Sequence, residues 1–179
     1  RSKKTHSLKA INSPVTQFLL YFAGGMLLFY IFYYSPIYEN WIMPALLHFQ
    51  AWLGSLLLKV FGEWTRVEGD QIIGEKFSVS IHGGCDGMEA TFLYIIALLA
   101  LPLVSLKEKY PALFYGVLTL SVLNIFRISL LYYAGVYWPR MFEFMHVHGG
   151  VIAFTMISII LWLFFVNRIL GKRNKSQTS

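Results

Sequence analysis

Charged residues are scarce in this 179-residue sequence: they make up 13% of it, whereas hydrophobic residues make up 56%. Soluble domains carry about 25% charged residues, so this composition excludes an ordinary soluble domain, and its apolar character excludes a disordered chain. Cysteine is almost absent, and the one cysteine cannot form a disulfide within the chain. A polytopic membrane protein remains, with room for about four to six helical spans of roughly 20 residues each.

Acidic residues are fewer than basic ones, nine against 15, and the placement of the basic excess indicates a membrane rather than a nucleic acid. The basic residues gather at the two ends of the chain, in residues 1–16 and 167–179, and around Lys107 and Lys109. Segments of this kind stay on the cytoplasmic side of a membrane. A nucleic-acid binder would carry its basic residues among base-stacking aromatics on a polar surface, so we expect no nucleic-acid partner.

Four apolar runs are long enough to cross a bilayer, namely residues 17–34, 88–104, 112–131 and 149–166. Four crossings leave both basic ends and the Lys107 loop on the cytoplasmic side. Residues 41–61 are apolar as well, but a fifth crossing would move one basic end to the wrong side. We therefore predict that this segment is an amphipathic helix in the outer interface, or a re-entrant helix.

Residues 63–84 have a more polar and β-prone composition than the rest of the chain. Apolar residues alternate with serines between Phe77 and Ile81, and Gly69 and Gly74 supply turns, which is typical of a short extracytoplasmic β-hairpin. The predicted fold is a single all-α polytopic membrane domain with about four transmembrane helices, an outer interfacial or re-entrant helix and this small hairpin.

The single cysteine, Cys85, directly precedes the predicted span 88–104. Asp86 and Glu89 have the spacing of a capping box, which would place Cys85 beside the positive end of the helix dipole, where a thiolate is favoured. Two interpretations stay open from position alone. Cys85 is either a reactive nucleophile or a buried structural cysteine whose pKa the two acidic neighbours raise.

Arg127 lies inside the predicted span 112–131. An arginine within a span costs at least about 2.5 kcal/mol on insertion scales and normally faces the bundle interior. A helical rise of about 1.5 Å per residue places it in the outer third of the membrane, on the same side as Cys85. Asn124 shares its helix face and is placed to hold the guanidinium. The alternative is that Arg127 extends to the outer headgroups as an anchor.

Glu143, His146 and His148 form a polar cluster at the outer start of the span 149–166. The two histidines are too close in sequence to lie on one helix face, so they fit a helical metal site poorly. We expect neither a metal nor another cofactor.

The predicted topology brings Cys85, Arg127 and His146 to one membrane depth on the outer face. These three residue types together are suited to acyl transfer. The thiolate attacks a carbonyl, the arginine stabilises the oxyanion, and the histidine protonates the departing amine.

Three blocks, residues 84–90, 123–128 and 142–146, resemble in this order the exosortase/archaeosortase family of membrane cysteine transpeptidases, most closely the compact exosortase H type. The resemblance covers residues 67–162. It implies that Cys85 is the nucleophile and that Arg127 and His146 are the second and third catalytic residues, with His148 as a second candidate for the histidine. Further candidates for supporting or substrate-binding roles are Asn124, His148, Glu89 and Glu143.

The resemblance also implies a location in the bacterial cytoplasmic (inner) membrane, with the active site facing the periplasm. The substrates would be exported proteins with a C-terminal sorting tail, made of a short motif, a transmembrane helix and a basic cluster. Cleavage would pass through a cysteine thioester to a surface acceptor such as a polysaccharide or lipid. Two other functions stay open: a non-enzymatic helical membrane subunit, and a haem or metal redox protein that uses His82, His146 and His148.

Overall fold

The computed structural model describes residues 13–177 except 82–84 and 103, and the side chains of residues 147, 148 and 172–177 are also outside this description. The helical elements are α2 (Pro14–Tyr33), the π-helical turn η1 (Tyr38–Ile42), α3 (Met43–Val60), α4 (Met88–Leu99), α5 (Leu106–Tyr137), α6 (Pro139–Phe144), the π-helical turn η2 (Met145–Gly149) and α7 (Gly150–Gln177). The strands are β1 (Thr65–Glu68), β2 (Gln71–Gly74) and β3 (Ser78–Ser80). This confirms the predicted fold class, a helical membrane protein with a small β-structure.

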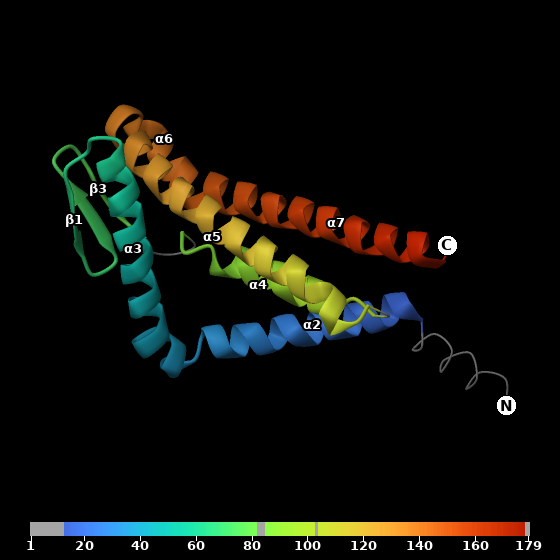
Figure 1. Cartoon of the computed structure of the whole chain (residues 1–179). Coiled ribbons are helices and arrows are strands. Elements are labelled where there is room, and N and C mark those ends of the chain that lie inside the picture. The colour runs from blue at the N-terminus through green and yellow to red at the C-terminus, as the bar shows by residue number, and fades with distance from the viewer. Residues whose placement is uncertain (1–12, 82–84, 103, 178–179) are drawn as a thin grey trace.

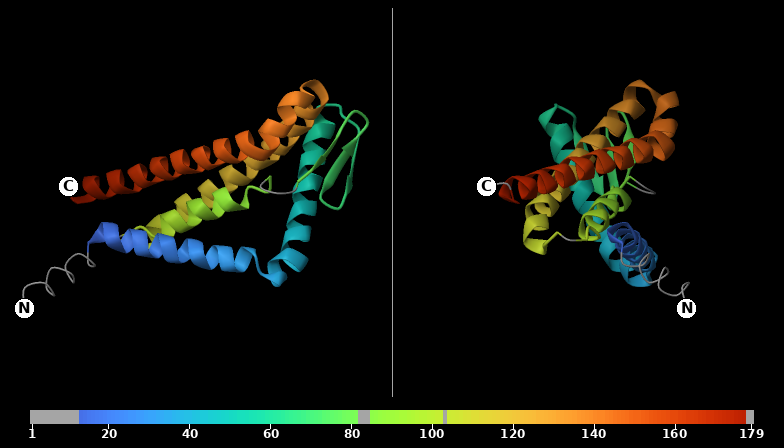
Figure 2. Two further views of the ribbon diagram at one scale, coloured as in Figure 1. Left: turned by 180° about the vertical axis from the view of Figure 1, so that it is seen from behind. Right: turned by 90° about the vertical axis from the view of Figure 1, so that its right-hand side faces the viewer.

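Helices α2, α4, α5 and α7 run along the length of the molecule, and α3 runs across one end of them (Figure 1, Figure 2). The start of α2, the start of α5 and the C-terminal end of α7 lie at the opposite end from α3 and the sheet. Lys107 and Lys109 open α5 at that same end. The arrangement therefore separates a basic end from the end that carries the sheet, as the charge pattern requires.

Four helical segments are long and apolar enough to cross a membrane: Pro14–Tyr33, Tyr38–Val60, Leu106–Tyr137 and Gly150–Gly171. The first and the last two correspond to predicted spans, but the predicted span 88–104 does not form a helix of that length. Residues 88–104 contain only the 12-residue helix α4. The reason is local: Pro102 disfavours a helical conformation in the residue before it. Lys109 Nζ donates to the carbonyls of Leu99 and Leu101, both at 2.7 Å. These hydrogen bonds give partners to carbonyl groups that the end of a helix leaves unpaired.

Helix α3 reaches spanning length together with η1, although the sequence placed it in the outer interface. Its crosswise position differs from that of the lengthwise helices (Figure 1). Leu47, Ala51 and Leu58 are buried on one side, while Trp41 and Trp52 are exposed. Exposed tryptophans are typical of membrane–water interfaces, so the interfacial location is favoured and stays a prediction.

The predicted hairpin is a three-stranded antiparallel sheet in the order β1-β2-β3. Val67 pairs with Ile72, and Ile72 pairs with Val79. Ile72 and Val79 are buried in a core shared with α3 and the C-terminal half of α5, and this core also contains Cys85. The sheet therefore covers the segment that carries the cysteine. A second core joins α4, α5 and α7.

Close contact between α4 and α5 depends on Gly116. A Cβ there would collide with the buried Tyr94 ring, whose hydroxyl donates to the Ala112 carbonyl at 2.6 Å. We predict that Gly116→Ala destabilises the protein by about 1–3 kcal/mol, the usual cost of overpacking. The matched control is Gly24→Ala on α2, where a Cβ meets nothing within 4 Å. Thermal unfolding in detergent should show a lower midpoint for Gly116→Ala only, and equal midpoints would contradict the prediction.

Candidate active site

The three polar residues singled out in the sequence meet at one point of the structure. Cys85 Sγ lies 3.2 Å from His146 Nδ1, and Arg127 Nη2 lies 3.6 Å from the same sulfur. Cys85 comes from the segment between β3 and α4, Arg127 from α5 and His146 from η2. Segments far apart in sequence thus place a thiol, an imidazole and a guanidinium within contact distance.

The His146 ring is oriented by Phe142, which lies one helical turn before it. Its ring stacks on that of Phe142, with a centroid distance of 5.2 Å and an interplanar angle of 17°. The residues are four apart, so they lie on one helix face. The turn η2 is π-helical, a form that is frequent at functional sites. Phe142 thereby limits the rotation of the imidazole that faces Cys85.

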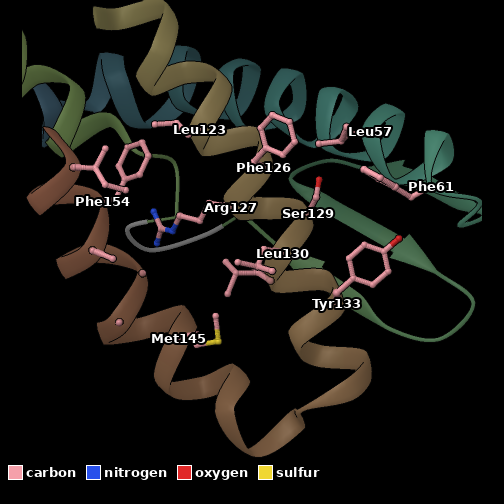
Figure 3. A pocket seen from close by; sticks show the side chains of 15 residues that line it. Leu57, Phe61, Leu123, Phe126, Arg127, Ser129, Leu130, Tyr133, Met145 and Phe154 are labelled. Atoms are coloured by element: carbon pink, nitrogen blue, oxygen red, sulfur yellow. The ribbon is translucent and has the colours of Figure 1, made fainter. Parts of the chain in front are cut away.

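Arg127 points into the space between α5 and α7 rather than away from the bundle (Figure 3). Its guanidinium carbon lies 5.7 Å from the centroid of the Phe154 ring, within the range of a cation–π interaction. A Cβ at Gly150 would lie 2.7 Å from Arg127 Nη2. Gly150 therefore leaves room for the guanidinium.

The start of α4 differs from the predicted capping box. The N-cap is Gly87, with φ at 68° and no side-chain cap, because glycine adopts this left-handed conformation at little cost. Asp86 still accepts a hydrogen bond from the Met88 N–H at 3.3 Å. Glu89 instead faces the Tyr30 hydroxyl at 3.5 Å. The prediction of Asp86 as N-cap is therefore wrong, although its carboxylate remains at the helix start.

The electrostatic setting favours a neutral thiol and a neutral imidazole at rest. Burial raises the pKa of Cys85, the charge of Asp86 raises it further, and Arg127 opposes both. Burial and Arg127 lower the pKa of His146, while Glu143 opposes them. The expected stabilisation of a thiolate by the helix dipole is thus outweighed by desolvation of a thiol that is 1% exposed.

The residues predicted to support the site differ in how they contact it. Asn124 Nδ2 donates to the Asp86 carbonyl at 3.1 Å and to Gln50 Oε1 at 3.3 Å. Glu143 is exposed and acts on His146 through its charge. The side chain of His148 and the whole of His82 fall outside the described part of the chain.

Sequence reasoning missed two residues that contact the cysteine segment. Gln50 Nε2 donates to the Asp86 carbonyl at 2.9 Å, and the Tyr33 hydroxyl donates to Asp86 Oδ2 at 3.2 Å. A polar side chain within the apolar run 41–61 was the available signal for Gln50, since such residues are often functional.

A cavity of about 790 Å³ adjoins the site (Figure 3). Arg127 lies at its wall, and the other lining residues are mostly apolar. They come from α3, α5, η2 and α7; Leu57, Phe126, Leu130, Met145, Phe154 and Ile157 are among them. Within the part of the chain that the structure describes, no three His, Cys, Asp or Glu residues are grouped so that they could hold a metal ion.

Fold and site together define a polytopic membrane protein in which a histidine and an arginine contact a buried cysteine at one end of its helices. The family model for transmembrane exosortases matches residues 14–163, and the chain belongs to this family. The match confirms the resemblance seen in the three motifs and extends it toward the N-terminus from residue 67. A search of curated proteins and a search of solved structures gave no match.

The charges around Cys85 make opposite predictions for two variants. Asp86→Asn removes a charge that raises the pKa of Cys85, whereas Arg127→Gln removes one that lowers it. We expect alkylation at pH 7 to become roughly two- to fivefold faster in Asp86→Asn and slower in Arg127→Gln, since the thiolate is the reacting species. Because Cys85 is the sole cysteine of the sequence, the rate of iodoacetamide labelling as a function of pH reports the reactivity of Cys85 alone. Glu68→Gln on the exposed sheet is the control. Labelling rates that change in the same direction in Asp86→Asn and Arg127→Gln would contradict the prediction.

Proposed function

We propose that this transmembrane exosortase is a cysteine protease and transpeptidase of the bacterial cytoplasmic membrane. It cleaves the C-terminal sorting tail of exported proteins on the periplasmic face and transfers them to a surface acceptor such as a polysaccharide or lipid. The observation that carries the proposal is the contact of Cys85 Sγ with His146 Nδ1 at 3.2 Å, beside the Arg127 guanidinium at 3.6 Å. This is the geometry expected of an activated nucleophile with a charge stabiliser.

In the first step, the Cys85 thiol transfers its proton to His146 Nδ1 as the sulfur attacks the scissile carbonyl. The new S–C bond converts the C=O double bond to an oxyanion. Arg127 donates hydrogen bonds to this oxyanion, in a buried site where a fixed positive charge acts strongly. The neutral resting state of Cys85 and His146 supports the role of His146 as the base, because a neutral imidazole can accept a proton.

In the second step, the oxyanion collapses and the C–N bond breaks. His146 returns its proton to the departing amine, and a thioester on Cys85 remains. An acceptor amine or hydroxyl then attacks the thioester, with His146 taking the acceptor proton and restoring it to the sulfur. Water in place of the acceptor gives hydrolysis.

The surroundings of the site suit an apolar substrate that enters from the bilayer. The 790 Å³ cavity beside Arg127 is lined mostly by apolar side chains, as a site for a membrane-embedded segment requires. A substrate whose basic cluster lies on the side of Lys107 and Lys109 would place its preceding motif near the opposite end, where Cys85 lies.

The first test is co-expression with exported proteins that end in a motif, a transmembrane helix and a basic tail. We expect wild type to remove the tail, and Cys85→Ala to remove none at the same membrane level, because no other thiol is present. His146→Ala and Arg127→Ala should each reduce cleavage by a factor of about 100 or more. Tail length on immunoblots and by intact mass is the readout.

The control for this test is Thr119→Ala, which removes an exposed hydroxyl from the helix of Arg127 and should cleave like wild type. Equal cleavage by wild type and Cys85→Ala would exclude Cys85 as the nucleophile. Intact tails with both, across several candidate substrates, would favour a non-enzymatic membrane subunit.

The pH dependence follows from the same environment. Activity requires an unprotonated His146, whose pKa lies below its ordinary value of 6.5, and a thiol whose pKa lies above its ordinary value of 9.0. Activity should therefore be lost only as pH falls below 6.5 or rises above 9.0, with a plateau between. Glu143→Gln should move the acid limb to lower pH, because Glu143 raises the pKa of His146. A kcat/KM profile with an acid limb well above pH 6.5 would contradict the assignment.

A further inference from the structure

Gln50 connects the crosswise helix α3 to the segment that carries Cys85. Its Nε2 donates to the Asp86 carbonyl oxygen at 2.9 Å. Asn124 Nδ2 donates to the same oxygen at 3.1 Å and to Gln50 Oε1 at 3.3 Å. Two side-chain amides from two helices thus satisfy both lone pairs of one main-chain carbonyl.

The hydrogen bond from Asn124 to Asp86 is buried, and its surroundings are tightly packed. Asn124 is 3% exposed, and a Cβ at Gly87 would lie 2.9 Å from Asn124 Cγ. A main-chain carbonyl in such an apolar setting needs hydrogen-bond donors from the protein itself. The pair Gln50–Asn124 therefore defines where the chain between Cys85 and Gly87 can lie.

We propose that Gln50 is a positioning residue for the Cys85 nucleophile and acts through the Asp86 carbonyl. The assignment rests on the proposed role of Cys85. Asp86 directly follows Cys85, so a displaced Asp86 peptide changes the distance from the sulfur to His146 Nδ1 and to the Arg127 guanidinium. Displacements of about 1 Å at a reacting centre can cost roughly a hundredfold in rate.

Two variants separate the hydrogen bonds from the volume of the side chain. Gln50→Met keeps a long unbranched side chain but can neither donate to Asp86 nor accept from Asn124. Gln50→Glu keeps the acceptor and places a carboxylate oxygen against the Asp86 carbonyl oxygen. The matched control is Ser55→Ala, which removes a buried hydrogen bond of the same helix to Thr65 Oγ1, 2.8 Å long.

We expect both Gln50 variants to lower kcat for tail cleavage roughly ten- to a hundredfold with little change in KM, since the geometry of the reacting groups is altered rather than substrate binding. Ser55→Ala should keep a kcat near that of wild type. Gln50→Glu carries the test if Gln50→Met does not accumulate in the membrane.

A second readout needs no substrate. Cys85 is 1% exposed, and loosening its segment should make it more accessible to iodoacetamide. We expect labelling in membranes to be about five- to tenfold faster in Gln50→Met, the factor that the loss of one hydrogen bond gives in a local opening equilibrium. Ser55→Ala should label at the wild-type rate.

The outcomes distinguish the two proposals. Wild-type kcat and labelling in both Gln50 variants, or the same changes in Ser55→Ala, would overturn the positioning role while Cys85→Ala still abolishes cleavage. Cleavage that persists in Cys85→Ala would overturn the proposed function and with it the catalytic role of Gln50.

Discussion

The hydrogen bonds that converge on Asp86 join four helices at the residue next to the cysteine. Its carbonyl accepts from Gln50 of α3 and Asn124 of α5, and its carboxylate accepts from Tyr33 of α2 and from the first backbone N–H of α4. Asp86 is 6% exposed, and leaving a buried polar group without partners costs about 1–3 kcal/mol. The location of Cys85 is therefore set by all four helices together.

Burial of this site has two opposing effects on its chemistry. Desolvation keeps the Cys85 thiol and the His146 imidazole neutral at rest, which lowers the amount of thiolate available. The same low dielectric strengthens the attraction between Arg127 and a negative charge that forms beside it. In the proposed mechanism, the thiol and the imidazole are uncharged until the carbonyl is attacked, and Arg127 then stabilises the oxyanion that forms.

Much of the site could be predicted from the sequence, because polar residues in an apolar chain are few and costly. Cys85, Arg127 and His146 are such residues, and hydropathy with charge placement put them at one depth, where the structure brings them together. Gln50 is also a polar residue in an apolar run, but its role and that of Gly87 could not be assigned in this way. Their roles depend on hydrogen bonds and close packing between segments 36 or more residues apart, which no local window of sequence contains.

The fold departs from the sequence prediction at α4, and this departure shortens the helix that begins beside the cysteine. Hydropathy counts residues 88–104 as one apolar run, but Pro102 and the Lys109 cap end the helix at Leu99. Twelve residues rise about 18 Å, whereas the hydrocarbon core measures about 30 Å. A helix of this length does not span the hydrocarbon core by itself. Cys85 precedes this short helix and is 1% exposed, in a core shared by the sheet, α3 and α5, and this burial favours our proposal that the substrate enters between the helices.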